Sequence, residues 1–271
     1  MENKQNLHTH TTYADGADSP EALVQEALAR GFSGIGFSEH SPNPYSTNPL
    51  RMTQEKMAPY VQEIRALKEK YRGKLDIFCG LELEFYSEAD TAGLDHLIGA
   101  VHYLEQAGRI RTFDVDPSGT DAYIREEFAG DGMAFARKYY ETLGRLGEKG
   151  VQIIGHFDLL AKHNDRVHWF DEDSKAYRDL AFGAMEALQG KVPYFEVNTG
   201  AMSRGYRQTP YPNLELLREL RRRGFGAVIT SDCHNKIYLD HGFEAAEILL
   251  REAGFSTKWV LTEGGFREVK I

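Results

Sequence analysis

The chain has 271 residues, of which 41% are hydrophobic and 27% charged, a composition typical of a globular protein rather than a disordered one. Its formal net charge of -9 argues against a broad phosphate-binding surface, because affinity for nucleic acid rests mainly on Lys and Arg side chains. No apolar run approaches the roughly 18 residues that span a bilayer, so we expect a cytoplasmic protein that binds neither nucleic acid nor a membrane.

Short apolar, β-rich runs recur along the chain, each followed by a longer stretch with helical spacing. They cover residues 6–10, 32–40, 75–85, 96–104, 151–160, 194–202 and 226–234. Alternation of strands with helices predicts parallel strands joined by right-handed crossovers. Because no linker or internal repeat interrupts the pattern, it predicts a single α/β domain over residues 1–271, a barrel of seven β/α units.

The stretches between these runs carry helix signals. Ser19 followed by Pro20 predicts the start of a helix, and Gly31 predicts its end. An apolar stripe with a spacing of three and four residues predicts a second helix over 57–71. Further helices are expected at 132–148, 174–189, 212–223 and 241–253, with a shorter one at 87–95. The remaining irregular segment, 105–131, is long enough for a lid or a substrate loop.

The two cysteines, Cys79 and Cys233, fall within expected strands, where an intracellular chain rarely forms a disulfide. We interpret both as small apolar residues. Two thiols are too few for a zinc site built from three or four thiolates. Any metal in this protein is therefore expected to bind nitrogen and oxygen.

Histidines gather where the expected strands end. The six at or near these carboxyl ends are His8, His10, His40, His102, His156 and His234. This rim is where α/β barrels build their sites. Because side chains alternate along a strand, Asp232 and His234 share a face, as do Glu82 and Glu84.

Each motif also has an ordinary structural explanation. The HxH motif is often two exposed histidines, S-D-C-H can be a helix cap, and Glu39 with His40 can be a surface ion pair. A lone histidine in an apolar run is commonly a core residue. Glu82 is harder to explain, because a buried carboxylate costs several kcal/mol unless it is paired or ligating. The shared position of these residues at the ends of separate strands favours one cause, a metal cluster.

The ordered set of motifs resembles the polymerase and histidinol phosphatase (PHP) superfamily of metal-dependent phosphoesterases. The resemblance covers HTH at 8–10, Asp15-Gly16, SEH at 38–40, GLE at 80–82, the histidine at 102, GH at 155–156 and SDCH at 231–234. It implies a distorted (β/α)7 barrel with two or three divalent ions.

The resemblance also implies a ligand set. The first ion would be held by His8, His10, Glu82 and Asp232. Glu82 would bridge to a second ion on His102 and His156, and a third would be held by Asp15, His40 and His234. Ligands of nitrogen and oxygen suit Zn, Mn or Fe.

Within the family, GAVHYL, the FDVD insertion, IIGHFDLLAK and FEVNTGAMSRG resemble the histidinol-phosphate phosphatases. This implies hydrolysis of L-histidinol phosphate to L-histidinol and inorganic phosphate, a step of histidine biosynthesis, by in-line attack of a hydroxide that bridges the ions. Two alternatives stay open. One is a PHP enzyme acting on nucleotides, oligonucleotide ends or phosphotyrosine, and the other is a metal-binding barrel without catalysis.

Several basic residues are candidates for binding phosphate. Arg204 is the first, because a guanidinium forms a rigid fork that matches phosphate oxygens. Lys162 and Arg207 are further candidates.

Acidic residues are candidates for catalysis and substrate recognition. Glu82 and Asp232 are expected to be catalytic through the ions, and Asp158 or His234 would serve as general acid. In the segment 105–131, either Asp114 or Asp116 would meet a cationic amine or imidazole, unless both are solvated turn residues.

Overall fold

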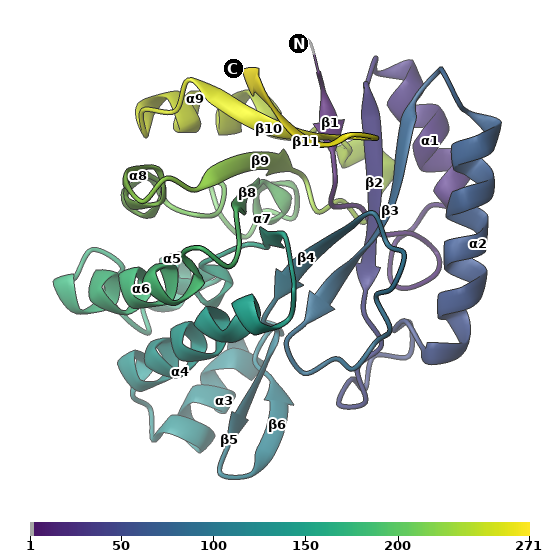
Figure 1. The fold of residues 1–271 in the computed structure, drawn as a ribbon. Helices are drawn as coiled ribbons and strands as arrows, with labels where there is room; N and C mark the ends of the chain where they lie inside the picture. Colours follow the sequence, from purple (N-terminus) through teal and green to yellow (C-terminus); the bar gives the residue numbers. More distant parts are fainter. Residues whose placement is uncertain (1–2) are drawn as a thin grey trace.

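The computed structural model describes residues 3–271, and a seven-stranded parallel sheet curls through its centre (Figure 1). The strands lie in the order β1-β2-β3-β4-β7-β8-β9. Their bounds are Gln5–Asn6, Gly34–His40, Asp76–Glu84, His96–Ala100, Ile153–Ile154, Tyr194–Asn198 and Gly226–Thr230.

The two edges of this sheet approach each other just beyond β1 and β9. Thr9 and Cys233 form an isolated parallel bridge, and the His10 N–H donates to the Cys233 carbonyl over 3.0 Å. On the other side, the Ser38 N–H donates to the Thr9 carbonyl, also over 3.0 Å. The sheet is therefore nearly closed, and the predicted (β/α)7 barrel is confirmed.

Helices surround the sheet on its outer side (Figure 1). Six of them are α1 (Pro20–Ala29), α2 (Gln54–Lys70), α4 (Gly132–Gly144), α6 (Lys175–Leu188), α8 (Leu214–Arg222) and α9 (Phe243–Glu252). Each overlaps a predicted helix, and Ser19 caps α1 as expected by accepting from the Ala22 N–H. Short helical segments are α5 (Asn164–Val167), α7 (Gly200–Ser203), η1 (Arg145–Glu148), η2 (Leu159–Ala161) and η3 (Lys236–Tyr238).

Two predicted segments differ from the structure. Residues 87–95 form turns rather than a helix, because the side chains of Ser87 and Asp90 accept from backbone N–H groups two residues ahead. The segment 105–131 is mostly regular. It contains part of a hairpin, β5 (Tyr103–Gln106) with β6 (Arg109–Thr112), and the helix α3 (Pro117–Phe128).

A second antiparallel hairpin, β10 (Thr257–Thr262) with β11 (Gly265–Lys270), ends the chain and packs beside β9. Sequence analysis assigned no element there. Leu261 of this hairpin joins an apolar cluster with side chains from the barrel strands.

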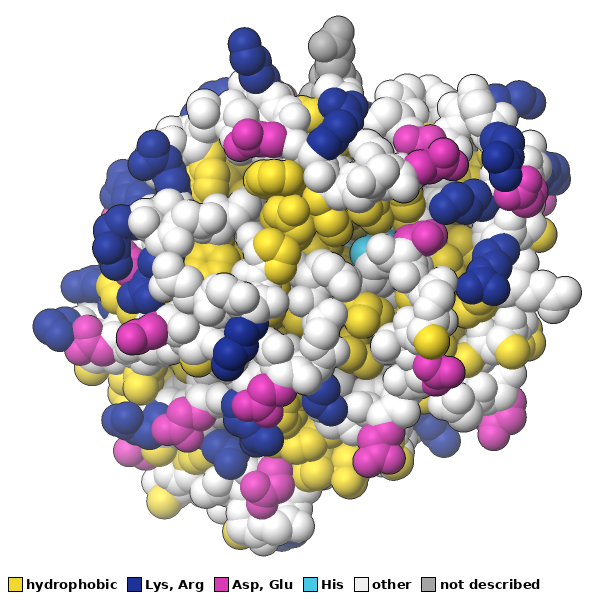
Figure 2. All heavy atoms as spheres, viewed as in Figure 1, with side chains coloured by type: hydrophobic (Ala, Val, Ile, Leu, Met, Phe, Trp, Pro, Cys, Tyr) yellow, Lys and Arg dark blue, Asp and Glu magenta, His cyan; other side chains and the backbone are white. Residues whose placement is uncertain are grey.

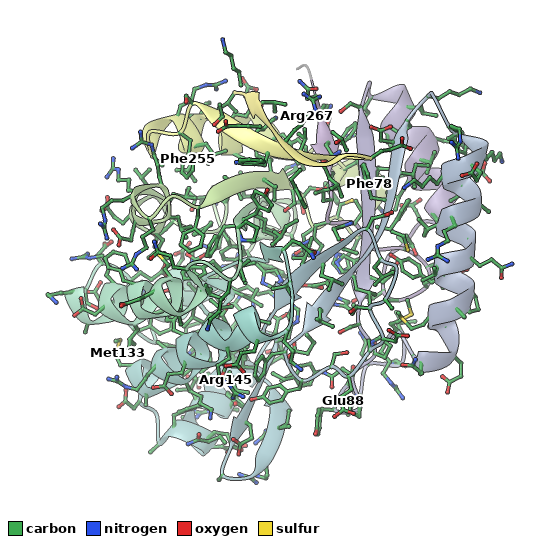
Figure 3. The ribbon with its side chains drawn as sticks, viewed as in Figure 1. Phe78, Glu88, Met133, Arg145, Phe255 and Arg267 are labelled. Atoms are coloured by element: carbon green, nitrogen blue, oxygen red, sulfur yellow. The ribbon has the colours of Figure 1, made fainter. Side chains whose placement is uncertain are left out.

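The inside of the barrel is apolar at one end and polar at the other. Leu7, Phe78, Ile98, Ile153 and Val228 form its apolar part. In Figure 3, Phe78 lies near the start of β3 and Glu88 lies just past its end, so the two labels mark the apolar end and the carboxyl-end rim.

His96 bridges these two parts of the interior. Its Nε2 lies 2.9 Å from both the Ser38 Oγ and the Leu7 carbonyl oxygen. A Cβ on Gly36 or Gly80 would approach the His96 ring within 2.8 Å or 2.5 Å, so the ring fits only because both positions are glycine.

The charged side chains on the surface and the state of the two cysteines agree with what the sequence predicts. On the face shown in Figure 2, Lys and Arg side chains are interspersed with Asp and Glu rather than gathered into one basic area. Within residues 3–271, no helix has the length and apolar character needed to cross a bilayer. Cys79 and Cys233 are buried and unpaired, as predicted.

Candidate metal centre

Glu82, near the end of β3, lies at the centre of the polar end of the barrel. Its Oε1 lies 2.7 Å from His156 Nε2 and 3.3 Å from His102 Nε2. Its Oε2 lies 2.6 Å from His40 Nδ1 and 3.8 Å from His10 Nε2. One buried carboxylate therefore contacts imidazoles carried by four separate segments of the chain.

Asp232 follows β9 and faces the same space. Its Oδ1 lies 3.2 Å from His10 Nε2 and 3.7 Å from His8 Nε2. The His8 Nε2 is also 3.7 Å from Glu82 Oε1. The four residues predicted to hold the first ion therefore meet.

The residues predicted to hold the third ion lie nearer the rim of the barrel. Asp15 Oδ2 is 3.6 Å from His40 Nε2, and Asp15 Oδ1 is 3.5 Å from His234 Nε2. These three side chains are 23–33% exposed, in contrast to the fully buried rings of His8 and His10. The Asp15-Gly16 turn is tight, since a Cβ on Gly16 would lie 2.4 Å from the His10 backbone.

The residues present fit divalent ions. His8 Nε2, both ring nitrogens of His10, Asp15 Oδ1 and Glu82 Oε2 are buried without a hydrogen-bond partner. Buried polar atoms are nearly always paired, so a convergent set of unpaired ones indicates an ion. Together with His40, His102 and His234, these residues form three groups. Within each group, every residue offers one possible metal-ligand atom, and these atoms lie within 4.8 Å of one another.

The electrostatics of the cluster depend on which charges face each ring. Burial opposes protonation of His102, but the Glu82 and Glu84 carboxylates outweigh it and raise its pKa to about 10. Burial likewise opposes protonation of His8, whose pKa the Glu196 and Asp232 carboxylates nevertheless raise well above the usual value.

His10 behaves in the opposite way. Burial, together with the neighbouring His234 and His40 rings, lowers the pKa of His10 to about 3. Although burial works against ionisation of Glu82, the surrounding imidazoles, His40 first, hold its pKa well below the usual range. The centre therefore contains a carboxylate whose ionised form is favoured, among rings of unequal basicity.

Two further carboxylates lie behind the predicted ligands. Glu84 Oε2 accepts from the His102 backbone N–H and lies 3.1 Å from His102 Nδ1, a role left unassigned in sequence analysis. Glu196 Oε2 lies 2.9 Å from His8 Nδ1. The signal for Glu196 was present, because a carboxylate in the apolar run YFEVN raises the same question as Glu82.

Among the residues predicted to bind phosphate, Arg204 lies directly against the ligand cluster. Its Nη2 donates to Asp232 Oδ2 over 3.0 Å, and its Nη1 lies 3.1 Å from His234 Nδ1. Its side chain remains 31% exposed at the rim.

A cavity of about 340 Å³ opens beside the cluster, and its lining includes Asp15, His40, Glu84, His102 and Asp114. Lys162 Nζ donates to Asp114 Oδ1 over 2.7 Å, which brings Lys162 to the edge of this cavity. The lysine holds the pKa of the partly buried Asp114 carboxyl at about 2, against the effect of burial. Asp114 is therefore an anion that faces the cavity.

Three other predicted site residues are not brought to the cluster. Arg207 donates to the Ala161 carbonyl and to Glu172, and it lines a separate cavity of about 800 Å³. Asp116 is exposed and caps α3 through the N–H groups of Ser118 and Gly119, since an aspartate just before a proline suits that position. The expectations that Arg207 and Asp116 meet the substrate are therefore not supported.

Asp158, predicted as a general acid, is fully buried at the start of η2. Its Oδ2 accepts from the Asn213 N–H over 3.2 Å. Burial raises the pKa of Asp158 to about 7, which suits an acid at neutral pH. Its contacts are nevertheless with the neighbouring loop and not with the ligand cluster, so its catalytic role stays a prediction.

The amino-acid sequence of the chain is similar to those of several known proteins. A family model of the PHP domain matches residues 6–200. The probable histidinol-phosphatase of Deinococcus radiodurans is 29% identical over 261 residues, which cover 92% of this chain and 94% of that protein. The histidinol-phosphatase of Bacillus subtilis is 28% identical over 266 residues, covering 89% of this chain and 97% of that protein.

Solved structures share the fold. A crystal structure from Listeria monocytogenes matches with a TM-score of 0.77 at 18% identity and covers 89% of this chain and 99% of its own. The histidinol phosphate phosphatase of Lactococcus lactis, complexed with zinc, L-histidinol and phosphate, matches with a TM-score of 0.70 at 21% identity. That match covers 98% of this chain and 99% of the Lactococcus chain.

Proposed function

Because this chain belongs to the PHP domain family, we propose that it is a metal-dependent phosphatase that hydrolyses L-histidinol phosphate to L-histidinol and inorganic phosphate. Relatives that match it over nearly their whole length are histidinol-phosphatases. The single observation that carries the proposal is the convergence of all nine predicted ligands on the space around Glu82. The reaction would serve histidine biosynthesis.

The ligand sets would hold zinc, the metal in the Lactococcus lactis structure, with Glu82 shared between ions. When bound, such ions lower the pKa of water and neutralise the charge that develops on phosphoryl oxygens. Three ions are proposed, since the structure forms three groups of ligands.

The residues of the chain would divide the remaining work. Arg204, at the rim beside Asp232, would donate to phosphoryl oxygens, because a guanidinium makes two parallel hydrogen bonds to a phosphate. Lys162, paired with Asp114 at the edge of the cavity, would add a second positive charge. Glu82 and Asp232 would act by holding the ions.

The cavity sets the size of the substrate. About 340 Å³ is at the small end of the range for ligand pockets and suits a phosphomonoester of the size of an amino-alcohol phosphate. The anionic Asp114 on its wall would attract the ammonium or imidazolium group of histidinol phosphate. A polynucleotide would need a basic surface, which the net charge of -9 opposes.

Steady-state kinetics on metal-stripped and zinc-reloaded protein test the proposal. We expect zinc to restore phosphate release, and kcat/KM for histidinol phosphate to exceed that for nucleoside monophosphates and a phosphotyrosine peptide. Equal or better turnover of either competitor would replace the proposed substrate. Zinc-loaded protein that hydrolyses none of the three would indicate a metal-binding barrel without catalysis.

A further inference from the structure

Glu196, on β8, is the most extensively hydrogen-bonded carboxylate at the metal centre. Its Oε1 accepts from the His156 backbone N–H and from Asn198 Nδ2, both over 2.6 Å. Its Oε2 accepts from Thr230 Oγ1 over 2.8 Å and lies 2.9 Å from His8 Nδ1. The side chain is fully buried, and its partners lie on or just beyond β1, β7, β8 and β9.

These partners place hydrogen-bond donors against both oxygens of the Glu196 carboxylate. The His156 group is a backbone amide, which can only donate. Asn198 Oδ1 already accepts from the Gly200 N–H over 2.8 Å, so the Asn198 amide is oriented with its NH₂ group toward Glu196. A side chain at this position must therefore accept on Oε1, and a carboxylate accepts on Oε2 as well.

We propose that Glu196 is a positioning residue that holds the hydrogen of His8 on Nδ1 and thereby presents the Nε2 lone pair to the metal site. A carboxylate only accepts, so the His8 Nδ1 must donate to it. The Nε2, which has no hydrogen-bond partner, then lies between Glu82 Oε1 and Asp232 Oδ1, at 3.7 Å from each. The inference rests on the proposed metal-dependent function, and it adds a residue that lies outside the ligand set.

The other histidines show that this arrangement is not general. His102 has a comparable partner in Glu84, at 3.1 Å from its Nδ1. Behind His10, the Glu39 Oε2 is 4.0 Å from Nδ1, and the latter has no hydrogen-bond partner. Among these three carboxylates, only Glu196 also accepts from the backbone N–H of a second predicted ligand, His156. It accepts from Asn198 as well, whose side-chain amide reaches Asp232 Oδ2 over 3.4 Å.

The variant Glu196→Gln tests the proposal because it keeps the shape and loses one acceptor. If the amide oxygen faces the His156 N–H, the NH₂ group faces His8, which must then accept on Nδ1 and carry its hydrogen on Nε2. If the amide is reversed, its NH₂ group faces two other donors, the His156 backbone N–H and the Asn198 NH₂ group, and neither of them finds an acceptor. We expect zinc affinity, measured by competition with a chelating dye, to fall roughly 10- to 100-fold.

Two comparisons separate positioning from general loss of packing. Glu247→Gln alters another largely buried carboxylate, which is paired with Lys258 at 2.8 Å and has no contact with the ligands, so it should leave zinc affinity unchanged. In a His8→Ala background, Glu196→Gln should weaken zinc binding by much less than in the unmodified protein. Unchanged zinc affinity in folded Glu196→Gln protein, or full additivity with His8→Ala, would overturn the proposal.

A measurement on the unmodified protein covers the case in which Glu196→Gln fails to fold. Nitrogen-15 NMR of the zinc-loaded protein should show His8 protonated on Nδ1 and bound to zinc through Nε2. Zinc on Nδ1 would refute the inference. These readouts do not involve a phosphate ester, so a wrong substrate assignment would be seen in the kinetics and would leave them unaffected.

Discussion

Arg204 and Asp232 are joined by two hydrogen bonds, one to the carboxylate over 3.0 Å and one to the backbone carbonyl over 3.1 Å. Asp232 has a positive φ of 47°, a conformation uncommon for residues other than glycine, and its carboxylate lies 3.2 Å from His10 Nε2. The predicted phosphate ligand is thus held directly against a predicted metal ligand. We therefore expect substrate binding and metal binding to be coupled at this point.

Arg204→Lys should lower kcat/KM for histidinol phosphate roughly 10- to 100-fold, the equivalent of one charge-assisted hydrogen bond of about 1.5–3 kcal/mol. A lysine keeps the charge and loses the planar fork. Inhibition by inorganic phosphate should weaken in parallel. Arg222→Lys, on an exposed part of α8, is the control. Unaltered phosphate inhibition in the Arg204 variant would remove this residue from the phosphate site.

Glu82→Gln should abolish metal binding and activity together, because one neutral amide replaces the charge that faces four imidazoles. The loss should exceed the roughly 10- to 100-fold cost of removing an indirect partner. Elemental analysis and phosphate release would be measured on the same preparation. Glu88→Gln, just beyond the same strand and exposed, should match the unmodified protein. Full activity without Glu82 would contradict the metal-centred mechanism.

Zinc binding should release protons at neutral pH. The pKa of His102 is raised to about 10 and that of His8 lies well above its usual value, so in the metal-free protein both rings carry an extra proton. Metal ligands must lose that proton, and zinc affinity therefore falls as the pH is lowered. Calorimetry in two buffers of different ionisation enthalpy counts the protons.

Activity should accordingly decline between neutral pH and pH 5. A binding heat that is identical in both buffers, or an activity profile that is flat over this range, would contradict the predicted protonation of the cluster.

Asp114→Asn should raise KM for histidinol phosphate while affecting an ester without a cationic group, such as glycerol phosphate, much less. The carboxyl of Asp114, with a pKa of about 2, is anionic at neutral pH and faces the cavity. Asp116→Ala is the matched control two residues away. It should cost about 1 kcal/mol of stability through loss of the α3 cap and leave KM unchanged. Equal effects on both substrates would argue against recognition of a cation by Asp114.

Asp15→Asn should reduce the zinc content by one ion per chain while the deeper ions stay bound. Asp15 contacts His40 and His234 at the more exposed rim, whereas His8 and Glu82 are buried away from it. Elemental analysis after dialysis against a weak chelator would measure the content. An unchanged count would show that this rim group does not hold an ion of its own.

Much of the site follows from short-range patterns. Alternating β and α periodicity places strands in parallel, and side-chain alternation then puts His8 and His10 on one face at the end of a strand. Because parallel strands in a barrel share one rim, residues far apart in sequence, such as Glu82 and His156, are expected at the same place before any coordinates are known. The structure confirms that they meet, at 2.7 Å.

Local hydrogen bonding limits such prediction. Residues 87–95 have a composition compatible with a helix, but Ser87 and Asp90 bind their own backbone instead. For the same reason Asp116 caps the start of α3. Arg207 is sequestered by Glu172, a partner 35 residues away that no spacing rule identifies.

The amino-acid sequence by itself determined the order of the seven barrel strands and of six helices, and which side chains stand at the strand ends, because these depend on periodicities of two to four residues. Only the tertiary structure decided how those side chains are oriented. Whether His8 presents one ring nitrogen or the other depends on Glu196, which lies 188 residues away in the chain and 2.9 Å away in space. Such a contact exists only after the barrel closes, since closure alone brings β1 and β8 into reach of each other.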